Sequence, residues 1–183
     1  MTCLIFLATH IVDIATVVAV IVALYAIRQQ SKDTHFSLGV QLLREYEKQF
    51  DSEEMKRDRA ALAKEYLKIR PGTLLDEKFE GITDPIDFFE AVGILLKRRA
   101  LDIELVESYF SYWFKRYWQI VEEDVKKFRN RHNDDSFWEH CDYLHKQLIK
   151  FGSEHPEHRE LLEEHFGESE MLRFLKEEAS SCD

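Results

Sequence analysis

Glycine, proline and cysteine are all scarce in this chain of 183 residues, which contains 6 Gly, 3 Pro and 3 Cys. So few chain breakers, among abundant Glu, Lys, Leu and Arg, favour helices over turns and strands. Three widely spaced cysteines, Cys3, Cys141 and Cys182, do not make a disulfide framework. Their spacing is typical of a protein from a reducing compartment.

Positive charge is also in short supply. The chain has 25 Lys and Arg residues against 35 Asp and Glu residues, which gives a formal net charge of −10. Such an acidic chain repels phosphate backbones, so we expect no nucleic-acid partner. Phosphate-binding loops, dinucleotide-binding glycine turns and nucleophile elbows are missing as well, so the motifs predict no cofactor and identify no catalytic residue.

The N-terminal segment, residues 4–27, has only His10 and Asp13 as strongly polar side chains. A helix of this length is about 36 Å long, which suffices for a hydrocarbon core of about 30 Å. We therefore predict a transmembrane anchor over residues 1–28. Its uncharged start and the poor cleavage sequence before Arg28 argue against a signal peptide.

Basic residues follow the predicted anchor, and none precedes it. This asymmetry predicts a single-pass protein of the cell inner membrane with its soluble domain in the cytoplasm. Asp13 is a functional candidate, and His10 lies on the same helix face, so we expect this pair to support homo-oligomers. In the alternative frame the span is 11–27, and Asp13 lies at the outer interface.

Beyond a juxtamembrane segment, residues 29–34, the pattern predicts an all-α domain over residues 35–179 and a frayed tail over residues 180–183. Apolar residues recur at helical spacing throughout, and Ser52, Asp84 and Asp102 are typical helix caps. The resulting fold class is a transmembrane helix followed by a bundle of about six helices. The helices are expected at about 35–50, 53–69, 85–99, 103–131, 134–152, 156–166 and 168–179.

The segment 103–131 is rich in aromatic residues. Most of them fall on one helical stripe and are expected in the core, together with Phe88 and Phe89 of the preceding helix. We expect Trp113 to be buried, whereas Tyr112 and Trp118 lie off the stripe and are expected to face a groove or a partner. The turn before this helix reads Arg99-Ala100, where glycine is typical.

Six of the 8 histidines follow residue 131, a concentration that raises the question of a metal site. Cys141 and His145 are four residues apart, and His155 and His158 are three apart, which suits ligands on a helix face. No CxxC or HExxH pattern supports the site, and Cys141 falls on a predicted core stripe. We therefore expect no bound metal and keep these four residues as weak candidates.

Several segments resemble a bacterial family of single-span proteins that carry an uncharacterised all-helical domain. The resemblance covers residues 30–148. It is carried by Leu42-Leu43-Arg44-Glu45-Tyr46, Asp51-Ser52-Glu53-Glu54-Met55, Asp87-Phe88-Phe89-Glu90, Leu95-Leu96-Lys97-Arg98, Leu101-Asp102, Trp113 and Arg116-Tyr117-Trp118. These motifs are helix caps and core aromatics, so the resemblance implies a fold and a domain of unknown function, and it implies no catalytic residues.

Together these observations predict a non-catalytic interaction or regulatory module with an unidentified protein partner. The alternative is a metal-dependent enzyme that uses the histidine-rich C-terminal third.

Overall fold

The structure is a computed structural model, and it describes residues 2–69, 79, 81–155, 157 and 166–181. Within the first helix, the side chains of residues 2–18, 32, 33 and 35 are not described. The chain divides into two compact units, residues 1–39 and 40–183. The predicted boundaries at residues 28, 34 and 179 are not tested by this division and stay predictions.

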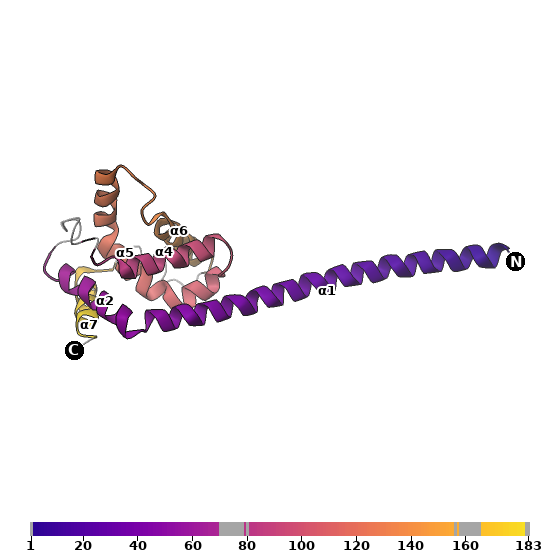
Figure 1. The fold of residues 1–183 in the computed structure, drawn as a ribbon, viewed down its shortest axis with the longest axis horizontal. Coiled ribbons are helices and arrows are strands. Elements are labelled where there is room, and N and C mark those ends of the chain that lie inside the picture. The colour runs from indigo at the N-terminus through magenta and orange to yellow at the C-terminus, as the bar shows by residue number, and fades with distance from the viewer. Residues whose placement is uncertain (1, 70–78, 80, 156, 158–165, 182–183) are drawn as a thin grey trace. The chain divides into compact units, whose positions relative to one another are not determined.

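The described residues form helices, which confirms the all-α prediction (Figure 1). No strand occurs among them. The six helices are α1 (Thr2–Phe50), α2 (Glu53–Tyr66), α4 (Asp84–Lys97), α5 (Ile103–His132), α6 (Glu139–Glu154) and α7 (Glu168–Ala179). The predicted helix at 156–166 falls almost wholly outside the described residues.

The predicted transmembrane helix needs correction. Across the described part of the chain, every helix is either too short or too polar to cross a membrane.

The start of α2 follows a local capping rule, whereas α4 begins at Asp84, the residue predicted to cap it, and its N-cap Thr83 makes no side-chain capping hydrogen bond. The Ser52 side chain accepts a hydrogen bond from the Met55 backbone N–H at 3.1 Å, as an N-cap should. Thr83 precedes α4, and Pro85 lies in its first turn, where a missing N–H costs nothing. The α4–α5 turn holds Arg99 at φ 59°, the left-handed conformation that favours glycine.

Helix α6 begins five residues later than the predicted start at Asp134. Residues between α5 and α6 form turns instead: Asn133 ends α5 in the left-handed conformation, and Asp134 accepts a hydrogen bond from the Ser136 backbone N–H at 2.8 Å. Such a side-chain turn competes with helix formation. Trp138, also at positive φ, is the residue after which α6 starts.

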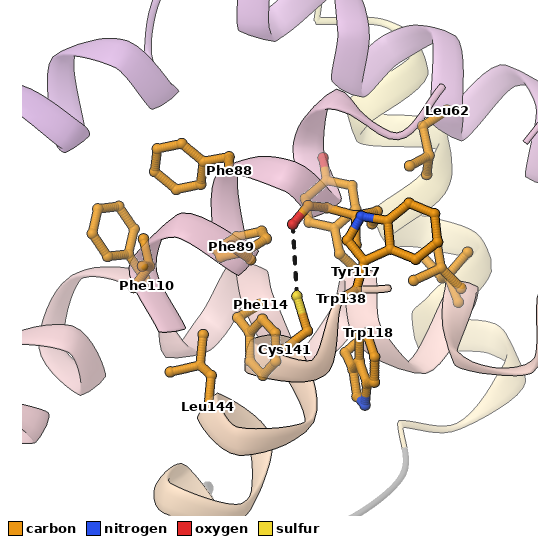
Figure 2. Packing of buried hydrophobic residues seen from close by; sticks show 14 of the residues in the cluster. Leu62, Phe88, Phe89, Phe110, Phe114, Tyr117, Trp118, Trp138, Cys141 and Leu144 are labelled. Atoms are coloured by element: carbon orange, nitrogen blue, oxygen red, sulfur yellow. Dashed lines mark hydrogen bonds between the residues drawn. The ribbon is translucent and has the colours of Figure 1, made fainter. Parts of the chain in front are cut away.

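The core of residues 40–183 is aromatic (Figure 2). Phe88, Phe89 and Phe110 are buried as predicted, whereas Trp113 is only partly buried. Tyr112 is exposed as predicted, but Trp118 is 2% exposed and its ring stacks on Phe114, so its predicted role at a groove is wrong.

Two helix pairs pack closely in this unit. Helix α4 lies against α6, and α2 lies against α7, as Figure 1 shows for the second pair. Helix α5 lies against α4 and α6. Side chains of α5 also reach α7, which places α7 over residues of both α2 and α5.

Candidate functional site

The surface beneath α7 contains two buried arginines. Arg59 of α2 is 4% exposed, and Arg116 of α5 is 8% exposed. We call the surface formed by Arg59, Trp113, Arg116 and Tyr117 the α7-binding surface. Buried guanidinium groups need counter-charges, and α7 supplies one to each of them.

Glu178 of α7 meets Arg59. Its Oε2 atom lies 3.3 Å from the Arg59 Nε atom, and both side chains are 5% exposed. The Tyr117 hydroxyl donates a hydrogen bond to the same oxygen. Burial, and then the neighbouring Glu178 carboxylate, raise the pKa of Tyr117 well above its usual value, so the hydroxyl keeps its proton.

Aromatic rings hold the Arg59 side chain in place. Its guanidinium carbon lies 4.2 Å from the centroid of the Phe50 ring and 5.0 Å from that of the Trp113 ring. Both distances lie within the range of cation–π attraction. The charge of Arg59 is therefore held by rings of α1 and α5 in addition to the carboxylate of α7.

Glu170 of α7 meets Arg116. The Nη2 atom of Arg116 donates to Glu170 Oε1 at 2.7 Å, and the guanidinium carbon lies 3.7 Å from the Tyr112 ring centroid and 4.1 Å from that of Phe166. The Nη1 atom also donates to the Tyr112 carbonyl. This arginine is thus held on two sides by rings and at its tip by a carboxylate.

Apolar residues of α7 lie between these two ion pairs. Phe174 is 2% exposed, and its ring centroid lies 5.2 Å from that of Tyr117 and 6.0 Å from that of Trp113. Leu175 is 7% exposed. Helix α7 thus presents glutamate, Phe-Leu and glutamate along one face, at positions 170, 174, 175 and 178.

A second polar region joins α4 to the start of α6. Glu90 Oε1 lies 2.6 Å from His140 Nδ1 and 3.2 Å from the His140 backbone N, and Glu90 Oε2 accepts from the Cys141 backbone N–H at 2.9 Å. A carboxylate at a helix N-terminus satisfies free N–H groups and complements the helix dipole. These polar groups therefore hold the two helices together.

An acidic hollow of about 360 Å³ opens among the end of α1, α2 and α4. Its rim carries Glu54, Asp58, Asp84 and Asp87, and the Tyr46 and Phe88 rings line it with centroids 5.5 Å apart. Burial, and then repulsion from Asp84 and Glu54, raise the pKa of Asp58 above its usual value. The ionised form of Asp58 is therefore destabilised by burial and by the neighbouring carboxylates of the hollow.

Three of the four metal candidates, Cys141, His145 and His155, lie in the described residues, and each has a different set of neighbours. Cys141 is fully buried, its Sγ donates to the Ile86 carbonyl (Figure 2), and burial raises the pKa of its thiol well above the usual value. His145 lies edge-on to Phe114, and His155 stacks on Phe151. His158 lies outside the described residues. Within the described residues, no group of three or more His, Cys, Asp or Glu side chains is placed to hold a metal ion.

The membrane-polar candidates His10 and Asp13 lie in α1, in the part of the helix whose side chains are not described. Their predicted roles stay predictions.

Sequence reasoning missed Arg59 and Glu178, although a signal was present. Arg59 fills the gap between Met55 and Leu62 in the apolar stripe of α2, and Glu178 follows Phe174 and Leu175 in that of α7. A charged residue inside an apolar stripe indicates either a broken stripe or a buried pair. Here the two interruptions face each other.

A sequence model of a domain of unknown function, DUF4760, matches residues 13–148. The match covers more than half of the chain, so the chain belongs to this family. It indicates neither a bacterial origin nor a membrane span. Comparisons with curated proteins and with solved structures found no match. The matched region ends within α6, so α7 lies outside it.

Proposed function

We propose that this member of the DUF4760 family is a non-catalytic interaction module that binds an amphipathic helix on its α7-binding surface. The observation that carries the proposal is α7 itself. It is a helix from outside the family match that covers two buried arginines of the matched region through two glutamates. In this view α7 is the helix that occupies the surface within the same chain.

The contacts resemble those by which proteins recognise helical peptides. Such peptides place anchor residues one and two turns apart on a single face. Helix α7 does so with Glu170, Phe174, Leu175 and Glu178, while Arg173 and Glu177 point away into solvent. Complementary charge at both ends fixes orientation and register, which gives specificity more than affinity.

A peptide-binding experiment tests the proposal. The probe is a fluorescent peptide of residues 167–181, added to the full chain and followed by anisotropy. In the full-chain variant Glu170→Gln, the internal helix loses its charge pair with Arg116, so the peptide should bind about tenfold tighter than to the wild type. A matched peptide carrying Phe174→Ala and Leu175→Ala should bind neither chain. Equal binding of the two peptides would contradict the proposal.

We also propose that the N-terminal helix contacts a membrane surface without crossing the membrane. Residues 20–27 of α1 include Val20, Ile21, Val22, Leu24, Tyr25 and Ile27, each more than half exposed. These side chains point to all sides of the helix, whereas one helical partner would cover a single face. Lipid acyl chains cover all sides, so we propose that this segment enters a lipid surface at the inner membrane.

Vesicle flotation tests this contact. The full chain should float with vesicles of a bacterial phospholipid mixture, and Leu24→Asp should reduce the floated fraction severalfold. Ser37→Asp, on an exposed position of the same helix, is the matched control and should float like the wild type. Self-association through His10 and Asp13 remains a separate prediction.

A further inference from the structure

The α7-binding surface holds a buried donor that α7 does not use. Arg59 is 4% exposed, and its Nη1 atom has no hydrogen-bond partner among the described residues. Its Nε atom approaches Glu178 at 3.3 Å but makes no hydrogen bond of good geometry. The Glu178 oxygen that faces Arg59 is shared with the Tyr117 hydroxyl.

This donor has no route to water. The Phe50 and Trp113 rings hold the guanidinium group in position, and the buried side chain cannot turn outward without losing both contacts. A buried donor left unpaired weakens the complex that buries it, by a factor on the order of ten. Helix α7 therefore complements the surface in charge and shape but provides no hydrogen-bond acceptor for Arg59 Nη1.

We propose that the partner helix of this surface is acidic and amphipathic like α7 and that it adds a second acceptor for Arg59 Nη1. This inference rests on the proposed function and names the chemistry of the partner. A helix that supplies both the carboxylate opposite Arg59 and an acceptor for Nη1 binds tighter than α7 and displaces it. Helix α7 is then a replaceable occupant that covers Trp113 and the two arginines until the partner arrives.

The chemistry of the added acceptor follows from the charges already present. Arg59 has one carboxylate opposite it, so a second buried carboxylate would bring an uncompensated negative charge. A neutral amide supplies the acceptor without that charge. Leu175 and Ala179 are buried α7 positions, three residues before and one residue after Glu178, so the amide is placed at one of them.

Peptides of residues 167–181 test the inference on the full-chain Glu170→Gln variant. Two peptides carry the acceptor, Leu175→Gln or Ala179→Gln. Each has a matched peptide of similar length and helix propensity without it, Leu175→Met or Ala179→Met. We expect one glutamine peptide to bind about tenfold tighter than its methionine match.

A second chain assigns the gain to Arg59. When Arg59→Lys is added, the Nη1 donor is lost and the charge remains, so glutamine and methionine peptides should bind equally. If that chain does not fold, hydrogen exchange of the wild-type chain decides instead. The tighter glutamine peptide should displace α7 and speed exchange of amides 168–179, while amides of α2 and α5 keep their protection.

The outcomes separate the two proposals. If the parent peptide binds but neither glutamine peptide exceeds its methionine match, the inference is overturned and the interaction module stands. A glutamine advantage that persists in the Arg59→Lys chain also overturns it. If no peptide binds, both proposals fail.

Discussion

The α4–α6 pair and the α2–α7 pair are joined in different ways. Between α4 and α6 the backbones nearly touch: a Cβ atom added at Gly93 would lie 2.3 Å from the His140 carbonyl oxygen. Glu90 also accepts hydrogen bonds from the backbone N–H groups of His140 and Cys141. The α2–α7 contact includes a buried ion pair, Arg59–Glu178, and leaves one Arg59 donor unpaired.

This difference between the two helix pairs indicates which contact is part of the family domain and which is exchangeable. Gly93, Glu90, His140 and Cys141, at which α4 and α6 meet, lie within the family match, and the backbones approach closely at Gly93. Helix α7 lies outside the match and is held by groups that another acidic helix also offers. We therefore expect α4–α6 to separate only when the domain unfolds, and α7 to separate alone.

The largest expected effect comes from Gly93→Ala. The added methyl group meets backbone atoms, which cannot rotate away as a side chain can, so the helices must move apart. Overpacking of this kind costs about 3 kcal/mol in the free energy of unfolding. Urea denaturation followed by circular dichroism measures it.

Gly167 provides the matched control, because a Cβ atom there meets nothing within 4 Å. Gly167→Ala at the start of α7 should change the free energy of unfolding by less than about 1 kcal/mol, since lower unfolded-chain entropy and a poorer N-cap oppose each other. Equal losses for the two variants would remove the contrast between the helix pairs.

Glu178→Gln tests the other half of the comparison. It leaves Arg59 without a counter-charge, which costs roughly 3 kcal/mol if α7 stays in place. Release of α7 lets Arg59 reach water, so the loss should fall on α7 alone. Hydrogen exchange should show amides 168–179 losing about a hundredfold protection while α4 and α6 keep theirs.

Glu177→Gln, at an exposed position of the same helix, should leave this exchange unchanged. A uniform loss of protection across all helices in the Glu178→Gln chain would show that α7 belongs to the cooperative unit. The proposed exchange of α7 for a partner helix would then be untenable.

Glu90→Gln weakens α4–α6 without touching its backbone packing. The glutamine amide turns its NH₂ group toward one of the two backbone N–H groups that donate to the Glu90 carboxylate, and the negative charge at the α6 N-terminus disappears. We expect a loss of about 2 kcal/mol, smaller than for Gly93→Ala. Thermal unfolding measures it, and an unchanged midpoint would mean that the cap contributes nothing to stability.

Local rules predicted much of the fold. Ser52 before α2, Pro85 in the first turn of α4 and Asp102 before α5 are local signals, and these helices begin within one residue of the predicted starts. The predicted start of α6 was wrong because Asn133 and Asp134 form turns. The N-terminal N–H groups of α6 are then satisfied by Glu90, about fifty residues away in sequence, and no pattern near Asp134 identifies that partner.

The candidate site was harder to predict for a similar reason. Arg59 and Glu178 interrupt two separate stripes, and only the packing of α2 against α7 shows that the interruptions meet. The histidine spacing drew attention to Cys141 and His145, but Cys141 serves the core. The predicted span depended on the hydropathy of residues 4–27, and each helix in the described part of the chain is too short or too polar to cross a membrane.

The smallest expected effect concerns the other side of α2, where Asp58 lines the acidic hollow. Burial and then Asp84 and Glu54 raise the pKa of Asp58 in the folded chain, so the folded state holds this proton to higher pH than the unfolded state does. Stability from Asp58 is therefore present at low pH and is lost as pH rises through the raised pKa. Asp58→Asn should leave the melting temperature unchanged near pH 3 and raise it slightly at pH 7.

Glu53→Gln is the matched control with the opposite sign. A hydrogen bond from Lys56 at 2.9 Å lowers the pKa of Glu53, so its contribution is present at neutral pH and is lost as pH falls through the lowered value. This variant should melt slightly lower than the wild type at pH 7 and equally near pH 2. If Asp58→Asn also melted lower at pH 7, the carboxylates of the hollow would stabilise the fold. The stability of the contact between α2 and α4 would then depend on charged side chains, as that of the contact between α2 and α7 does.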